Sequence, residues 1–137
     1  MARRVDAQDE VTLSLNWPPS VNHYWNQRGQ GGRYISAFGK AYREEVWVEF
    51  KRRYPGRKPL ACRVGVRIFA SPPDNVRRDL DNILKSILDS MQHAGVYQDD
   101  SQIDALEVYR TQEHHDAIHV IIWPLAHVPH ETEMSPA

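Results

Sequence analysis

A short run near the middle of the chain, Arg77-Arg78-Asp79-Leu80-Asp81-Asn82, places two arginines directly before two carboxylates. Lys85 follows one helical turn after Asp81, and a second acidic pair, Asp99-Asp100, comes later. Converging carboxylates repel one another, so a folded chain tolerates them best around a cation. Oxygen ligands alone favour a hard ion such as Mg²⁺ or Mn²⁺. A few carboxylates leave coordination positions for water and a phosphate, as in metal-assisted phosphodiester hydrolysis.

The neighbouring basic residues suit the same chemistry. Lys85 would offer positive charge to a phosphate as its negative charge builds. Arg77 and Arg78 would hold the strand, because arginine binds phosphate through two parallel hydrogen bonds. Each residue also has an ordinary structural interpretation: Asp79 could cap a helix, Asp81 and Lys85 could form an i, i+4 ion pair, and Asp99 with Gln102 has the spacing of a capping box.

The element that must position these residues is a helix over Asp79 to Ala94. Its apolar residues recur at the spacing of one buried stripe, and Gly95 stands where a C-terminal cap belongs. Asp81 and Lys85 would lie beside one edge of that stripe. With Asp79 as the N-cap, Asp79 and Asp81 could converge at the start of the helix.

The remaining pattern predicts one α+β domain with a mixed sheet, in the order strand, helix, strand, helix, strand, strand. Asn26 to Arg33 contains three glycines and reads as a mobile, basic loop. The other expected elements are strands over Val11 to Asn16, Leu60 to Ala70, Ile103 to Thr111 and Ile118 to Trp123, the last two as a hairpin across Gln112 to Asp116, and a helix capped by Ser36 that runs to about Arg53.

Composition sets the limits within which this domain must work. The 137 residues are 41% hydrophobic and 26% charged, as in an ordinary globular domain. We expect a flexible N-terminus over 1–10, one folded domain over 11–124 and a disordered tail over 125–137. No apolar stretch is long enough to cross a membrane, there is no secretory signal, and the lone Cys62 permits no intrachain disulfide, so the expected location is cytoplasmic.

The charge is distributed unevenly along the chain. The net charge of −1 does not indicate nucleic-acid binding. However, the segment from Asn22 to Lys58 contains nine basic residues and only three acidic ones. From Gln98 to Glu133 there are eight acidic residues and one basic residue, Arg110. A basic surface could therefore hold phosphates beside an acidic region that holds cations. Arg28 and Arg33 of the glycine-rich loop are candidate DNA contacts.

At this point the sequence resembles the RusA family of Holliday junction resolvases. Three segments carry the likeness, which extends over roughly Leu13 to Trp123. They are Arg78-Asp79-Leu80-Asp81-Asn82 with Lys85 and Asp99-Asp100, Trp17-Pro18-Pro19-Ser20 with Asn22 and Tyr24, and Ser36-Ala37-x-Gly39-x-Ala41-Tyr42-Arg43.

The resemblance implies a homodimeric, Mg²⁺-dependent endonuclease that nicks four-way DNA junctions symmetrically in recombination and repair, with no small-molecule cofactor. It implies that Asp79, Asp81 and Asp100 bind the metal, with Mn²⁺ as a possible substitute, and that Lys85 is the catalytic lysine. It also implies a bacterial, phage or prophage source. The tail beyond Trp123 matches nothing in the family.

Two questions stay open at this stage. A helix of about 22 Å and a six-residue return of at most about 20 Å leave undecided whether Asp100 rejoins its own Asp79 or serves a dimer partner. The preferred substrate could also be flaps or forks, or the protein could bind DNA without cutting it.

Overall fold

A computed structural model of the chain describes residues 9–27 and 32–125. Its elements follow the sequence as β1 (Val11–Asn16), α1 (Val21–Tyr24), β2 (Trp25–Gln27), β3 (Arg33–Ile35), α2 (Ala37–Arg53), β4 (Val64–Ser71), α3 (Asp81–Ala94), the 3₁₀ helix η2 (Asp100–Gln102), β5 (Ile103–Arg110) and β6 (Ala117–Pro124). The fold is a small α+β domain with a mixed sheet, as the sequence predicts.

The central sheet has the strand order β1-β6-β4-β5. Strand β4 runs parallel to β5 and antiparallel to β6, and β6 runs antiparallel to β1. The expected hairpin between the last two strands is therefore wrong: β4 lies between them. The reason is the crossover through α3, which returns the chain in the direction of β4, so that β5 can join β4 only as a parallel neighbour. Strand β6 then takes the other side of β4.

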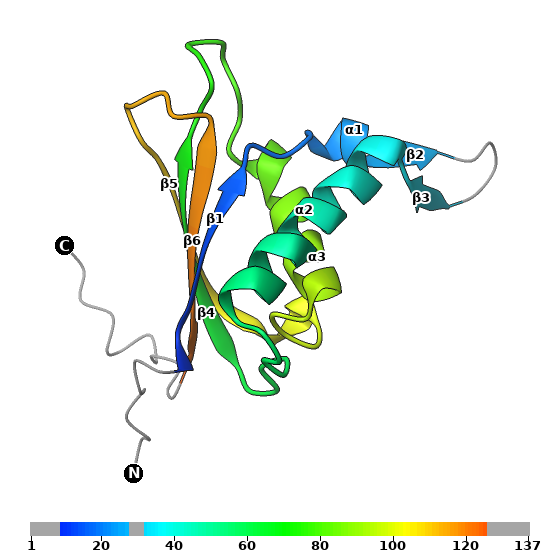
Figure 1. Cartoon of the computed structure of the whole chain (residues 1–137). Coiled ribbons are helices and arrows are strands. Elements are labelled where there is room, and N and C mark those ends of the chain that lie inside the picture. Colours follow the sequence, from blue (N-terminus) through cyan, green and yellow to red (C-terminus); the bar gives the residue numbers. More distant parts are fainter. Residues whose placement is uncertain (1–8, 28–31, 126–137) are drawn as a thin grey trace.

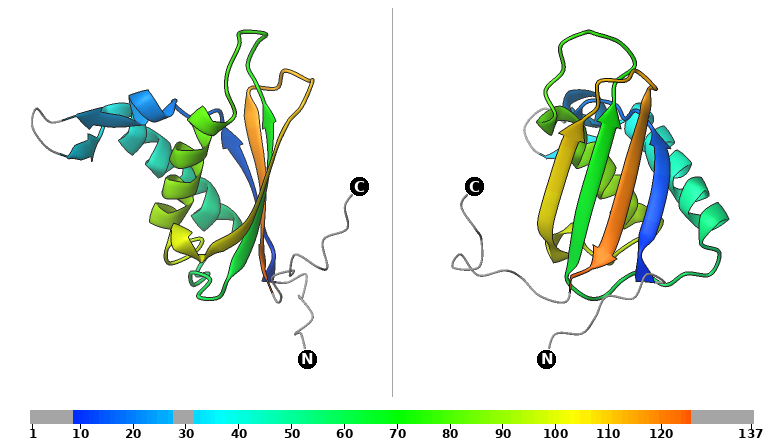
Figure 2. Two further views of the ribbon diagram at one scale, coloured as in Figure 1. Left: turned by 180° about the vertical axis from the view of Figure 1, so that it is seen from behind. Right: turned by 90° about the vertical axis from the view of Figure 1, so that its left-hand side faces the viewer.

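Helices α2 and α3 cover one face of this sheet (Figures 1 and 2). That face carries the alternate apolar side chains of the strands, which are fully or nearly fully buried against the apolar stripe of α3. No described helix covers the opposite face, which the right-hand view of Figure 2 presents to the viewer. There the rings of Phe69 and Tyr109 stack at 5.5 Å, and Trp123 lies over Gly65.

Helix α2 begins as predicted. The Ser36 hydroxyl accepts a hydrogen bond from the backbone N–H of Gly39 at 3.0 Å, the bond of an N-cap. Helix α3 ends at Gly95, whose φ of 91° is the left-handed cap conformation that glycine adopts readily.

The segment from Val21 to Ile35 differs from the sequence expectation. A one-turn helix, α1, leads into β2, and β2 pairs antiparallel with β3, so both ends of the expected loop belong to a small two-stranded sheet. Arg28 falls among residues 28–31, which lie outside the described residues, as do residues 1–8 of the expected flexible N-terminus over 1–10 and residues 126–137 of the expected tail over 125–137. Within the described part of the chain, no helix has the length and apolar character needed to span a bilayer.

Candidate active site

The loop between β4 and α3 is folded around Asp74. Its carboxylate accepts a hydrogen bond from the backbone N–H of Val76 at 2.9 Å and pairs with the Arg78 guanidinium at 2.5 Å. The hydrogen bond from Arg78 holds the pKa of Asp74 below its usual value. Because the Arg78 guanidinium also lies 5.9 Å from the centre of the Trp17 ring, Arg78 connects this loop to the segment that follows β1. Arg77 is exposed beside it.

Asp79 does not cap α3, contrary to the sequence interpretation. The N-cap is Leu80, in helical conformation and without a side-chain cap. The chain has already turned at this point: the backbone carbonyls of Asp79 and Leu80 accept hydrogen bonds from Asn82 at 3.2 Å and from Ile83 at 3.3 Å. The backbone carbonyl of Asp79 therefore takes part in the turn, whereas the Asp79 carboxylate makes no capping hydrogen bond to the helix.

The side chains of Asp79 and Asp81 are exposed at this end of α3. Within residues 9–27 and 32–125 neither carboxylate has a hydrogen-bond or ion-pair partner. Asp89, further along the same helix, instead pairs with Arg43 at 2.7 Å. The two carboxylates at the start of α3 are thus available to a cation or to a ligand from solution.

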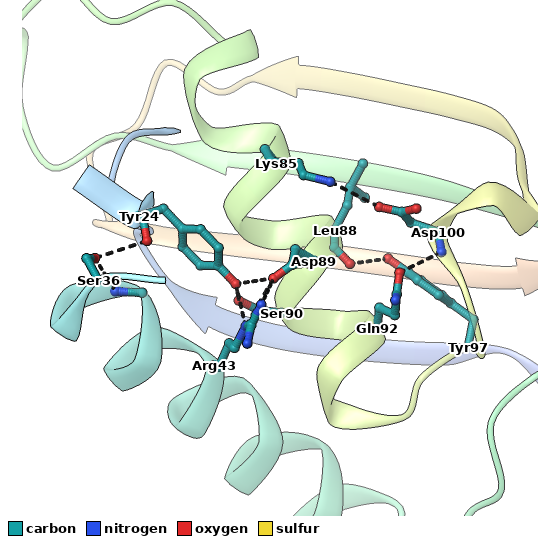
Figure 3. A network of polar contacts seen from close by, with 11 residues as sticks. Tyr24, Ser36, Arg43, Lys85, Leu88, Asp89, Ser90, Gln92, Tyr97 and Asp100 are labelled. Atoms are coloured by element: carbon teal, nitrogen blue, oxygen red, sulfur yellow. Dashed lines mark hydrogen bonds and ion pairs between the residues drawn. The ribbon is translucent and has the colours of Figure 1, made fainter. Parts of the chain in front are cut away.

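Lys85 lies beside Asp100 (Figure 3). Its ammonium nitrogen is 3.5 Å from a carboxylate oxygen of Asp100, and both side chains are partly exposed. The i, i+4 partnership of Lys85 with Asp81, considered from the sequence, is not the one the structure contains. Asp100 returns along the same chain to the second turn of α3, so the crossover brings the later acidic residue to the helix at whose start the first two lie.

Asp100 is held in place by its backbone. The side-chain oxygen of Gln92 accepts a hydrogen bond from the Asp100 N–H at 2.9 Å (Figure 3). The predicted capping box between Asp99 and Gln102 is present, and the Asp99 carboxylate accepts from the Ser101 N–H at 2.8 Å, which lowers the pKa of Asp99. Two side-chain bonds from Gln102 to the Leu60 and Cys62 carbonyls, both at 2.8 Å, anchor this turn to the segment before β4.

The structure does not gather the three predicted metal ligands into one cluster. Among the described residues, no three Asp, Glu, His or Cys side chains lie close enough together to hold an ion. The donor chemistry nevertheless suits Mg²⁺, because this ion keeps several waters and is commonly bound by one or two carboxylates together with substrate phosphates. The exposed carboxylates of Asp79 and Asp81 fit that kind of site better than a closed cage.

A pocket of about 520 Å³ opens beside Asp79. It explains why the Trp-Pro-Pro-Ser segment after β1 accompanies the acidic motif in the sequence: that segment forms one wall, and the start of α3 forms the other. His23 of α1, which sequence reasoning did not select, also lines it. The lining residues are Trp17, Pro18, Pro19, Ser20, His23, Arg77, Arg78, Asp79, Asn82 and Ile83.

A second group of polar residues joins three helices below the site, and sequence reasoning did not foresee that Asp89 connects Tyr24 with Arg43. The Tyr24 hydroxyl donates to the Asp89 carboxylate, and the Arg43 Nε donates to the Tyr24 oxygen at 2.8 Å (Figure 3). Burial and the hydrogen bond to Asp89 raise the pKa of Tyr24 to about 12. The available signal was Asp89 within the apolar stretch of α3, since a carboxylate near a core requires a partner.

The small sheet β2–β3 carries the remaining predicted DNA contact. Arg33 is exposed and its guanidinium lies 5.2 Å from the centre of the Trp25 ring. Arg43 approaches the same ring at 5.9 Å, so the network around Tyr24 also supports this small sheet, which we call the β2–β3 arm.

The fold and site define a small α+β domain whose exposed carboxylates and arginines suit a phosphodiester substrate. Comparison with known proteins agrees: the family model described as endodeoxyribonuclease RusA matches residues 16–123. The chain is 42% identical over 102 residues to the crossover junction endodeoxyribonuclease of Enterobacteria phage HK97, covering 74% of this chain and 83% of that protein. It is 40% identical over 92 residues to the enzyme of the same name from Shigella sonnei (67% of this chain and 75% of that protein) and 39% identical, with the same coverage, to that of Escherichia coli K12.

The chain belongs to the RusA family of endodeoxyribonucleases. It is accordingly a nuclease that acts on DNA phosphodiester bonds, as the resemblance implied.

Proposed function

We propose that the protein is a Mg²⁺-dependent endonuclease that resolves four-way DNA junctions by paired symmetric nicks in recombination and repair. The observation that carries this proposal is the pair of exposed carboxylates at the start of α3, between two arginines and a lysine, which have no hydrogen-bond or ion-pair partner among the residues that the structure describes. The names of its relatives, crossover junction endodeoxyribonucleases, supply the substrate. Their bacterial and phage sources favour action in a bacterial cytoplasm.

In this proposal Asp79 and Asp81 would hold the ion, and Asp100 would complete the acidic set. When bound, Mg²⁺ would polarise the phosphodiester and generate the attacking hydroxide at neutral pH. Lys85 stands 3.5 Å from Asp100 and is partly exposed, so its ammonium can turn to the phosphate as charge builds there. Arg77 and Arg78 border the pocket beside Asp79 and would orient the strand.

A homodimer is part of the proposal. A four-way junction offers two equivalent strands, and a two-fold enzyme offers two equivalent sites. Because one chain does not gather all three aspartates, the set could be completed on DNA binding or by the partner subunit. Light scattering of the purified protein should give twice the chain mass of 15.9 kDa.

The test is cleavage of a labelled synthetic four-way junction, with and without Mg²⁺, by the wild type, Asp81→Asn and a control, Glu44→Gln, which removes an exposed carboxylate of α2. We expect paired nicks from the wild type and the control, and binding without nicks from Asp81→Asn. Tight binding without cutting by the wild type in Mg²⁺ or Mn²⁺ would leave a DNA-binding protein. Faster cutting of flaps or forks than of junctions would change the substrate and keep the chemistry.

A further inference from the structure

A second pocket, of about 500 Å³, lies on the other side of Arg77 and Arg78 from the pocket beside Asp79. Both arginines line both pockets and so form the partition between them. The far wall of the second pocket is the end of β5, which contributes Arg110, together with the connection from β5 to β6, which contributes Gln112 and His114. Sequence reasoning assigned this connection only to the turn of a hairpin, and Arg110 was only the single basic residue of an acidic region.

The topology places the two walls together. Strands β4 and β5 are parallel, so the loop that leaves β4 and the loop that leaves β5 emerge at the same end of the sheet (Figures 1 and 2). Hydrogen bonds then join the end of β4 to the connection that follows β5. The Ser71 hydroxyl donates to the Glu113 carbonyl at 2.7 Å and accepts from the His115 N–H at 2.8 Å, and the Thr111 N–H donates to the Ala70 carbonyl at 2.9 Å. Ser71 is buried, so this is a firmly built wall.

The charge of the second pocket is strongly one-sided. Three arginines line it against one carboxylate, Asp74, and that carboxylate is already engaged by Arg78. Arg77 and Arg110 have no carboxylate partner within the described residues, and the Arg110 guanidinium donates to the backbone carbonyl of Arg78. The lining is therefore rich in hydrogen-bond donors and short of anions, which is the character of a phosphate site.

We propose that this second pocket binds a backbone phosphate of the DNA strand beside the phosphodiester that is cut, with Arg110 and His114 as its contacts. The inference rests on the proposed nuclease function. A strand that passes from one pocket to the other crosses Arg77 and Arg78, which then contact the phosphates on either side. The β5–β6 connection thereby becomes part of the DNA-binding surface. These contacts position the DNA and carry no sequence information.

The test uses Arg110→Gln and His114→Gln, with two matched controls. His115→Gln changes the adjacent histidine, whose ring pairs with Glu113 and does not line the pocket. Arg63→Gln removes an arginine that pairs with Asp104 at the start of β4 and β5, away from the loops. Circular dichroism and thermal unfolding would establish that each variant folds, and Arg110→Lys would test whether charge alone restores binding.

Binding to a four-way junction would be measured in EDTA across a range of salt concentrations. We expect Arg110→Gln to weaken binding about tenfold and to reduce the slope of log K against log salt by about 1, because one phosphate contact is lost. His114→Gln should weaken binding several-fold, and both controls should match the wild type. Wild-type affinity and slope in both pocket variants would overturn the inference while leaving a junction-cutting wild type intact. A wild type that neither binds nor cuts junctions would overturn the proposed function and the inference together.

Discussion

Lys85 and Asp100 form the most informative pair of side chains in the molecule. The ammonium nitrogen of Lys85, which is expected to face the phosphate, lies 3.5 Å from the carboxylate of Asp100, one of the three acidic residues expected to face the metal. If the pair acts as one unit, removing either member should remove most of what both supply. The exposed position of the pair makes a purely structural contribution small.

We therefore expect Lys85→Gln and Asp100→Asn each to slow single-turnover cleavage by about 100-fold or more, and the double variant to be little slower than either. Thermal unfolding should change little in all three. Effects on the cleavage rate that multiply in the double variant would show that the two residues act independently.

Tyr24 should make stability depend on pH in the alkaline range. Its folded pKa of about 12 lies above the ordinary value of 10, chiefly because burial disfavours the charged phenolate. Between pH 10 and 12 the unfolded chain loses this proton while the folded chain keeps it, so the contribution of Tyr24 to stability is present below pH 10 and is lost toward pH 12.

Tyr24→Phe should thus lower the free energy of unfolding by about 1–2 kcal/mol at pH 8, because the hydrogen bonds with Arg43 and Asp89 disappear. The stability gap between the wild type and the variant should narrow from pH 10 to 12. Urea unfolding at several pH values measures the gap. A gap that stays constant over this range would contradict the assignment.

At the scale of elements, the start of α2 presses directly on the end of α1. A Cβ added at Gly39 would lie 2.5 Å from the Tyr24 carbonyl oxygen and 2.7 Å from the Ile35 side chain. The Ser36 hydroxyl donates to the same Tyr24 carbonyl at 3.0 Å while it caps α2. The motif Ser36-Ala37-x-Gly39 therefore holds the β2–β3 arm in a fixed position against α2.

We expect Gly39→Ala to destabilise the protein by about 1–3 kcal/mol, although alanine normally favours a helix, since backbone must move to admit the methyl group. The neighbouring control Lys40→Ala, at an exposed position, should be nearly neutral. DNA binding should weaken in Gly39→Ala beyond what the stability loss explains, because the arm that carries Arg33 shifts. Unchanged stability and DNA binding would mean that the contact of Gly39 with Tyr24 and Ile35 does not fix the position of the arm.

Sequence reasoning succeeded where a pattern is local and failed where a partner is distant. The period of β1 and the cap of α2 at Ser36 are set by neighbours in the chain, and both were predicted. The predicted hairpin between β5 and β6 was wrong because the prediction paired neighbours in the sequence. In the structure β5 lies on one side of β4, and β6 pairs with the other side of β4. The pairing of Lys85 with Asp100 was missed for the same reason: the i, i+4 partner Asp81, which was considered as a structural alternative, is visible in the sequence, and the distant partner is not.

For the whole molecule, the net charge of −1 hides a surface suited to DNA. Arg33, Arg77, Arg78 and Arg110 lie on the arm or line the two pockets, where phosphates are expected. If each contacts one phosphate, the slope of log K against log salt should be about −3.6 per protomer. Titration of a junction at several salt concentrations measures it. A slope near zero would mean that binding does not depend on phosphate contacts.

The pairing of β1 with β6 has a consequence for the order in which the chain can fold. Val11 pairs with Ile122 and Asn16 with Ala117, so the first strand of the sheet joins only the last one. While the ribosome is still adding residues before Ala117, the apolar side chains of β1 have no strand to pair with, although the β4–α3–β5 unit with its acidic residues is already complete. The crossover that carries the candidate site can therefore form early, but closure of the sheet must wait until β6 has been synthesised, and the nascent chain exposes an unpaired strand until then.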